Sequence, residues 1–270
     1  MAVSGAESFY VADGDGFVGT LLSQGAWDPG TQTGIAVLAL LGHVLEDLPT
    51  LTPMSLARIT VDLVRPVPIG KRLDIVSTTV REGKKLQVLE LAVVVGDVEH
   101  ARARVLRLRD ADVSESPGMP ASSTDDDPAA ALVPPEQLPR LVSDEGPAMM
   151  RALDLRRSPA GGDDRFAFWT RLLVPVVAGE PIRPTSVQTV GVDFTNCIGA
   201  AINPRVASTI NPDVSAEFLR RPEGEWIAIV GDTRFDHRVG RGISTATLSD
   251  RTGVFGAATA SQLVQPIGPR

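Results

Sequence analysis

The sequence is poor in cysteine and in aromatic residues. Its 270 residues include one cysteine, Cys197, and 4% aromatics. A single cysteine cannot form an intrachain disulfide, and no group of Cys and His has the spacing of a zinc site. The core is therefore expected to consist mainly of Val, Leu, Ile and Ala, and the protein is expected in a reducing compartment, the cytoplasm.

Long hydrophobic runs are also missing. The longest apolar run, Ile35 to Leu41, is far short of the ~20 residues that a membrane-spanning helix needs. The first 16 residues lack the basic and apolar regions of an export signal. Neither membrane insertion nor export is expected.

Positive charge is scarce as well. The formal net charge is −7 and the sequence pI is about 5.1. Nucleic-acid binding needs a concentrated Lys/Arg surface, so nucleic acid is not expected as a partner. A small anionic ligand needs only a local cluster of basic side chains and is not excluded.

A stretch from about Asp112 to Asp127 is rich in Ser, Pro, Gly and Asp and has almost no apolar surface to bury. Such a composition is typical of a linker. It predicts an N-terminal unit over residues 1–111, a linker over 112–145 and a C-terminal unit over 146–270. The chain is long enough for two domains of modest size.

The two units show the same order of elements. In the first, apolar residues at helical spacing predict a helix from about Thr31 to Glu46, followed by strands rich in branched residues. In the second, the strand-like FAFWTRLLV precedes a predicted helix from about Pro184 to Ile202 and further strands. The predicted strands cover residues 59–64, 73–80, 86–95, 101–109, 208–219, 226–235, 243–248 and 254–263. An internal duplication is expected, with an α+β fold in which a helix covers one sheet face.

Several segments resemble a known family. They are GAWDPGTQTG and ARITVDLVRPVPIGKRL in the first unit, with FWTRLLVPVVAGEPIRPTSVQTVGVDFTN, INPDVSAEFLRRPEGEWIAIVGDTRF and GRGISTATLSDRTGVFGAATASQLV in the second. Together they resemble the double-hotdog acyl-CoA thioesterases of the thioesterase-II-like family. The resemblance implies two antiparallel sheets, each wrapped around a long central helix. The chain departs from the family at Thr33-Gly34-Ile35, where members often have His-Gly-Gly.

The resemblance implies three site positions. The family's helix carboxylate corresponds to Asp193 in this sequence. Its polar residue on the next strand corresponds to Asn211, and its glutamine on the last strand corresponds to Gln262. Matching the local Ser-Thr-Ile instead selects Thr209 for the strand position. Residues 209 and 211 share a strand face, so either could face Asp193, and Asn211 is favoured.

These residue types suit thioester hydrolysis. An ionised carboxylate can take a proton from an attacking water, while neutral amides can orient that water without adding charge. A backbone amide near a helix N-terminus is the expected donor to the oxyanion. Taken alone, however, Asp193 would be read as a capping or surface residue, and Gln262 is as readily a structural amide as a site residue.

Two other functions stay open. A non-catalytic acyl-CoA-binding protein is one, because Leu263 stands where the family carries Glu. A hotdog hydratase or dehydratase is the other, although that class needs an Asp and a His close together, as in an N-P-I-H-type segment, and here Asn211-Pro212 is followed by Asp213 with no His nearby in sequence. The substrate is expected to be an acyl-CoA, with no cofactor and no metal, and pairing of hotdog units predicts a homo-oligomer.

Weaker signals have simpler interpretations. The string from Gly14 to Gly19 matches G-x-G-x-x-G but lacks a βαβ context, so a turn is predicted. Cys197, one turn after Asp193, is predicted to be a small core residue rather than a nucleophile. The histidines are isolated in sequence. Four basic residues could meet a phosphate of CoA, or could be solvated strand ends: Arg58, Arg65, Lys71 and Arg72.

Overall fold

The computed structural model describes residues 8–26, 28–118, 127–141, 148–159, 165–196 and 207–266. Within these ranges the chain forms thirteen strands, two α-helices and three short 3-10 helices. The helices are α1 (Gly34–Leu45) and α2 (Pro184–Asp193), with η1 (Leu21–Ser23), η2 (Pro135–Gln137) and η3 (Ala148–Arg151). The strands are β1 (Tyr10–Asp13), β2 (Gly16–Gly19), β3 (Met54–Asp62), β4 (Arg72–Arg81), β5 (Leu86–Val95), β6 (Val98–Arg109), β7 (Leu153–Arg157), β8 (Arg165–Leu172), β9 (Ala207–Ile210), β10 (Asp213–Phe218), β11 (Ile227–Asp236), β12 (Arg241–Asp250) and β13 (Gly253–Pro266).

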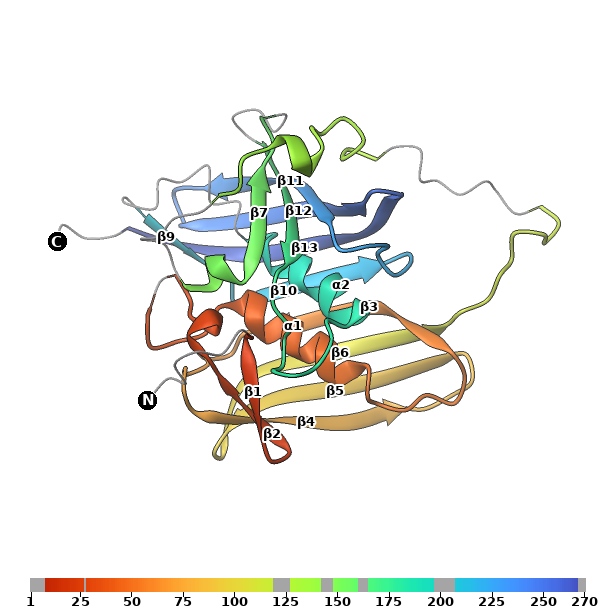
Figure 1. Cartoon of the computed structure of the whole chain (residues 1–270), viewed down its shortest axis with the longest axis horizontal. Helices are drawn as coiled ribbons and strands as arrows, with labels where there is room; N and C mark the ends of the chain where they lie inside the picture. The colour runs from red at the N-terminus through yellow and green to blue at the C-terminus, as the bar shows by residue number, and fades with distance from the viewer. Residues whose placement is uncertain are drawn as a thin grey trace.

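All of these strands belong to one antiparallel sheet. Its order is β1-β2-β4-β5-β6-β3-β10-β13-β12-β11-β8-β7, with β9 paired to β13. The two halves of the chain meet where β3 pairs with β10, from Asp62 opposite Asp213 to Arg58 opposite Glu217. The expected antiparallel sheets and two helices are present, but the halves share one continuous sheet rather than forming two separate ones (Figure 1).

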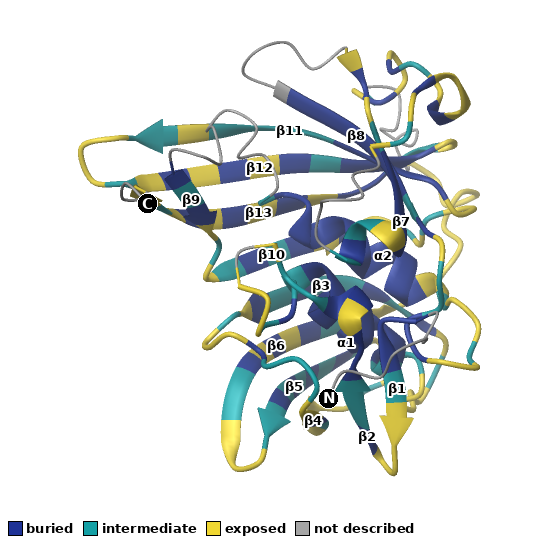
Figure 2. Cartoon of the chain, turned by 60° about the vertical axis from the view of Figure 1, so that its left-hand side comes forward, coloured by how far each residue is buried: buried dark blue, intermediate teal, exposed yellow. Residues whose placement is uncertain are grey.

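The two helices lie next to each other on the same side of the sheet (Figure 2). Helix α1 begins after Thr33, whose side chain accepts a hydrogen bond from the Ile35 N–H, and is buried along nearly its whole length. Small residues let the helices approach closely: a Cβ added at Gly42 would lie 2.3 Å from Thr189 Oγ1. Thr189 Oγ1 also donates to the Leu38 carbonyl oxygen at 2.8 Å.

The burial of α1 explains the longest apolar run of the sequence. No helix in the described part of the chain is long and apolar enough to cross a membrane.

Helix α2 is shorter than the sequence pattern predicts. It ends at Asp193, and the N–H groups of Thr195 and Asn196 bond to carbonyl groups three residues earlier. Thr and Asn compete for backbone hydrogen bonds and favour helix ends, which accounts for the early stop. Residues 197–206 lie outside the described residues, and so does the predicted core position of Cys197.

Besides shifts at strand ends, such as β3 over Met54–Asp62 where 59–64 was predicted, the strand pattern differs from the prediction in three places. The predicted strand 208–219 is divided into β9 and β10 at Asn211-Pro212, because proline has no N–H for the ladder. The hairpin of β1 and β2 was not predicted as strands, although the turn predicted around Gly14 is present, with φ of 64° at Gly14. Strand β7 was also missed; it pairs with β8 at one end of the sheet.

Part of the predicted linker packs against the second half of the sheet. Ala129, Leu132 and Leu138 are buried in a small apolar cluster that includes Trp169 of β8 and Trp226. The Trp169 Nε1–H donates to the Val133 carbonyl oxygen at 3.1 Å. Residues 127–141 therefore follow the surface of the sheet.

Candidate active site

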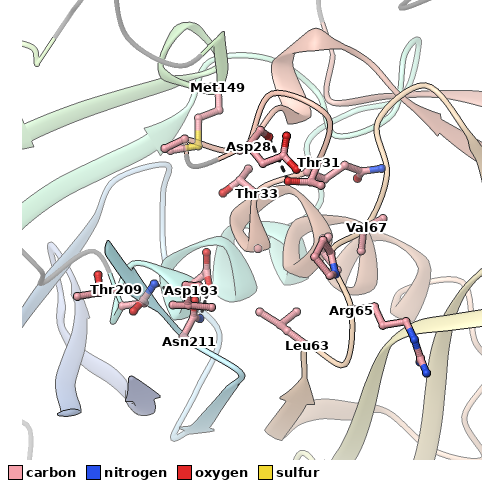
Figure 3. A pocket seen from close by; sticks show the side chains of 18 of the residues that line it. Asp28, Thr31, Thr33, Leu63, Arg65, Val67, Met149, Asp193, Thr209 and Asn211 are labelled. Carbon is pink, nitrogen blue, oxygen red and sulfur yellow. Dashed lines mark hydrogen bonds between the residues drawn. The ribbon is translucent and has the colours of Figure 1, made fainter. Parts of the chain in front are cut away.

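A pocket of about 640 Å³ lies where the C-terminal end of α2 meets the N-terminal end of α1. Its remaining walls come from the loop before α1, the loop after β3, Met149 of η3 and the β9–β10 region (Figure 3). The lining residues are Gly25, Ala26, Asp28, Thr31, Gln32, Thr33, Gly34, Val37, Leu63, Val64, Arg65, Pro66, Val67, Met149, Asp193, Asn196, Ala207, Thr209, Ile210 and Asn211. Both halves of the chain thus contribute to one cavity.

Asp193, the last residue of α2, lies at this cavity and is 6% exposed. Its Oδ1 accepts a hydrogen bond of 2.8 Å from Nδ2 of Asn211. The backbone N–H of Ile35, in the first turn of α1, also donates to this carboxylate. The carboxylate of one half therefore meets the positive N-terminal end of the other half's helix.

Burial raises the pKa of Asp193, and the hydrogen bonds from Asn211 and Ile35 act in the opposite direction. Removing a carboxylate from water disfavours its charged form, whereas donors stabilise that form. A carboxyl group with a raised pKa binds a proton more readily than an exposed aspartate. That property suits a group that must accept a proton during a reaction.

A chain of hydrogen bonds runs from Asp193 to Gln262. Oδ1 of Asn211 accepts from Nδ2 of Asn196 at 2.8 Å, and the Asn196 carbonyl oxygen accepts from Nε2 of Gln262 at 3.3 Å. Gln262 Nε2 also donates to Ser244 Oγ at 2.6 Å. Among the described residues, Gln262 Oε1 is buried without a hydrogen-bond partner. Among the described residues, hydrogen bonds link Gln262 to Asp193 through the two asparagines, and none joins the two side chains directly.

The two strand candidates have different surroundings. Asn211 bonds directly to Asp193, whereas Thr209 lies in β9 opposite Val264 and lines the pocket wall. Thr209 is buried, and no hydrogen bond joins it to Asp193 within the described residues. Figure 3 shows Asp193 and Asn211 close together with Thr209 beside them. The contacts favour Asn211 as the partner of Asp193.

Gly34, the first residue of α1, lies directly against the Asp193 carboxylate. A Cβ added there would lie 2.6 Å from Asp193 Oδ1 and 2.7 Å from both Cγ and Oδ2. Real Cβ atoms do not approach other heavy atoms so closely, so any side chain at position 34 would displace the carboxylate. The absence of a side chain at Gly34 thus allows the contact between the two helix ends.

A similar arrangement occupies the opposite end of the helix pair. Glu46, which follows α1, accepts the Thr185 N–H at 3.0 Å, so it caps α2 as Asp193 caps α1. A second pocket of about 510 Å³ lies there. Arg107 of β6 lies opposite Gln87 of β5. At the corresponding place in the other half, Gln262 of β13 lies opposite Gly242 of β12. The Arg107 guanidinium contacts the carbonyl groups of Leu45 and Leu48, so this end carries a fixed positive charge in place of a neutral amide.

The basic residues and histidines are spread over the molecule. Of the four basic residues considered for a phosphate, only Arg65 lines the larger pocket. Arg72 is held by carboxylates of Asp13, Asp15 and Asp74. His43 Nε2 lies 3.1 Å from Glu180 at the far end of α1, and burial lowers the pKa of this histidine. No histidine lines the larger pocket among the described residues.

The sequence pattern did not reveal Asn196 or Gly34 as parts of this site. The available signal for Asn196 was its spacing, because it stands three residues after Asp193, about one helical turn further on. Gly34 is the one residue of Thr33-Gly34-Ile35 that agrees with His-Gly-Gly, and the packing of the two helices explains its role.

Residues 23–108 match the family described as the acyl-CoA thioesterase N-terminal domain. No curated protein matches the chain at a significant level of sequence similarity.

Solved structures share the fold along nearly the whole chain. An acyl-CoA thioesterase II TesB2 from Mycobacterium marinum has a TM-score of 0.62 and 14% identity, covering 92% of this chain and 98% of that one. The tesB protein of Mycobacterium avium subsp. paratuberculosis has a TM-score of 0.66 and 16% identity, with coverage of 95% and 96%. A hot dog fold protein of unknown function from Alicyclobacillus acidocaldarius reaches 0.71 at 18% identity, with coverage of 98% and 97%.

The family match covers the first half of the chain, the solved structures share the fold of nearly the whole chain, and both agree with the resemblance found in the sequence. Residues 23–108 are thus similar to an acyl-CoA thioesterase domain, and the chain as a whole has the hotdog fold of these solved structures.

Proposed function

We propose that this protein hydrolyses acyl-CoA thioesters to the free acid and CoA, with a water molecule activated by Asp193. The observation that carries the proposal is the buried Asp193 carboxylate, which lines a 640 Å³ pocket and lies against the N-terminal end of α1. No metal or cofactor takes part in the proposed steps.

In the first step the water oxygen attacks the thioester carbonyl carbon and its proton passes to Asp193. The carbonyl oxygen becomes an oxyanion, and the N–H of Gly34 in the first turn of α1 is our candidate donor to it. In the second step the carbon–sulfur bond breaks, and the leaving thiolate takes the proton back from Asp193. The products are a carboxylic acid and the thiol of CoA, so atoms and protons balance.

We assign Asn211 as the group that orients the carboxylate, because its Nδ2 donates directly to Asp193. Gln262 acts as a positioning residue in this proposal. Its bond to the Asn196 carbonyl supports the turn from which Asn196 reaches Asn211. Thr209 contributes to the wall of the pocket.

The direct test replaces the carboxylate by an isosteric amide. Asp193→Asn is expected to lower the rate of thiol release from fatty acyl-CoA by at least ~100-fold, the lower scale for a general base. The matched control is Glu46→Gln, since Glu46 caps the other helix in the same way but lines the second pocket. Glu46→Gln should hydrolyse at close to the wild-type rate.

The outcomes separate the alternatives. If both variants lose activity equally, the loss reflects helix capping and the assignment of Asp193 as the base is wrong. If the wild-type protein binds acyl-CoA but releases no thiol at any chain length, the non-catalytic binding protein is favoured. Hydration of an enoyl-CoA would indicate the hydratase class, which the histidine-free lining of the described pocket disfavours.

A further inference from the structure

Arg65 lies at the larger pocket, on the loop that follows β3. It is the only basic residue among the described residues that line this cavity. Figure 3 shows it on one side of the pocket, with Asp193 and Asn211 on the other and Leu63 between them. A cationic group and the proposed reaction centre thus stand at separate ends of one cavity.

The backbone around Arg65 is fixed on several sides. The Arg65 N–H donates to the His100 carbonyl oxygen at 2.9 Å, and His100 Nδ1 lies 2.7 Å from the Pro66 carbonyl oxygen. The next residue but one, Val67, accepts the Gln32 N–H at 2.8 Å. Proline at position 66 also restricts Arg65 to extended conformations. The guanidinium therefore starts from a well-defined point at the pocket wall.

The Arg65 guanidinium forms no ion pair within the described part of the chain. Its Nη1 donates to the backbone carbonyl oxygen of Glu99 at 2.8 Å, and no carboxylate within the described ranges lies at ion-pair distance. Arg72 differs, because three carboxylates surround it. A guanidinium carries five N–H donors in a fork that fits phosphate oxygens, so Arg65 retains donors for an anionic ligand.

We propose that Arg65 binds a phosphate group of the CoA part of the substrate and so sets the preference for CoA thioesters over thioesters without phosphate. This inference rests on the proposed function of the same pocket. With the thioester at Asp193, the uncharged arm of the substrate crosses the wall formed by Leu63 and the phosphates reach Arg65 at the rim.

The chain supplies its own matched control. Arg221 also precedes a proline and also follows the strand at the junction of the halves, but it lines the second pocket. There its Nε donates to Ser55 Oγ at 3.2 Å. Arg221→Ala removes a comparable charge from a comparable loop without touching the larger pocket.

The experiment compares KM for an acyl-CoA with KM for the S-acylpantetheine of the same acyl group. Arg65→Ala should raise KM for the acyl-CoA by about tenfold, as expected for loss of a charge-assisted hydrogen bond, and leave KM for the acylpantetheine unchanged. Arg65→Lys should recover part of the loss, and Arg221→Ala should match the wild type. Raising the salt concentration should weaken acyl-CoA binding by the wild type more than by Arg65→Ala.

Equal KM values for acyl-CoA in Arg65→Ala and the wild type would overturn the proposal, and so would an equal rise for both substrates. Calorimetric titration with free CoA and with pantetheine gives the same comparison without turnover. If no thioester is hydrolysed, the proposed function fails, yet weaker CoA binding by Arg65→Ala alone would still support the phosphate contact. Unchanged CoA binding in that variant would refute the contact whether or not the protein hydrolyses thioesters.

Discussion

The contact between Gly34 and the Asp193 carboxylate makes a specific prediction for Gly34→Ala. The added Cβ would lie 2.6 to 2.7 Å from the three atoms of the carboxyl group. Ordinary contacts of this kind are ~3.5 Å or longer, so the carboxylate must retreat by about 1 Å. A misplacement of about 1 Å can lower a rate by about 100-fold.

The assay is thiol release from an acyl-CoA, measured with purified Gly34→Ala and with the wild type. We expect kcat/KM to fall by about 100-fold, with most of the change in kcat. Overpacking costs about 1 to 3 kcal/mol, and the preference of alanine for a helix offsets up to ~1 kcal/mol of it, so the free energy of unfolding should fall by at most ~2 kcal/mol. The double variant with Asp193→Asn should be hardly worse than Asp193→Asn alone, because both changes act on the same carboxylate.

Gly42→Ala is the control on the same helix. Its Cβ would lie 2.3 Å from Thr189 Oγ1 and 2.7 Å from the Thr185 carbonyl oxygen, away from the proposed base. We expect it to lower the free energy of unfolding by about 1 to 3 kcal/mol, as overpacking does, and to leave kcat of the folded protein intact. Wild-type kcat/KM in Gly34→Ala would refute the argument that this contact fixes the carboxylate.

Three further predictions follow from the surroundings of Asp193. Because burial raises the pKa of Asp193, kcat/KM should fall as the pH drops through a value above the ordinary aspartate range, and a pH profile with the ordinary value would contradict this. The folded state binds a proton at Asp193 more readily than the unfolded state does. Ionisation of Asp193 therefore lowers the free energy of unfolding as the pH rises towards the pKa of Asp193 in the folded state. Asp193→Asn should therefore raise the melting temperature at neutral pH. The gain should disappear near pH ~4, below which Asp193 is protonated in both the folded and the unfolded state. An equal gain in melting temperature at both pH values would argue against ionisation as its cause. Asn211→Ala should lower kcat by about 10- to 100-fold through loss of its hydrogen bond to the Asp193 carboxylate. Thr209→Val should change kcat by less than about threefold. Equal losses of kcat in the two variants, measured in a steady-state assay, would argue against Asn211 as the strand partner.

Local patterns in the sequence predicted much of the fold. The apolar spacing that indicated a helix after Thr31 matches α1, and the branched runs match β4 and β5 closely. These elements have buried faces with clear periodicity. By contrast, β7 has only five residues, and the break between β9 and β10 depends on a single proline inside a run that otherwise looks like one strand.

Contacts distant in sequence could not be predicted in the same way. Joining of the halves through β3 and β10 depends on pairs more than 150 residues apart, such as Asp62 and Asp213. The meeting of Asp193 with Gly34 likewise depends on how two buried helices cross. The resemblance selected Asp193, Asn211 and Gln262 as site residues, and their catalytic roles, together with the boundaries at residues 111 and 146, stay predictions.

The reciprocal capping of the two helices bears on how such a chain can diversify. Two identical subunits would present two identical helix ends, and any substitution would alter both at once. A tandem chain removes that constraint, so Gly34 can accompany an aspartate at one end while Thr185 accompanies Glu46 at the other. One end can then adapt to new ligands while its counterpart evolves for rigidity alone.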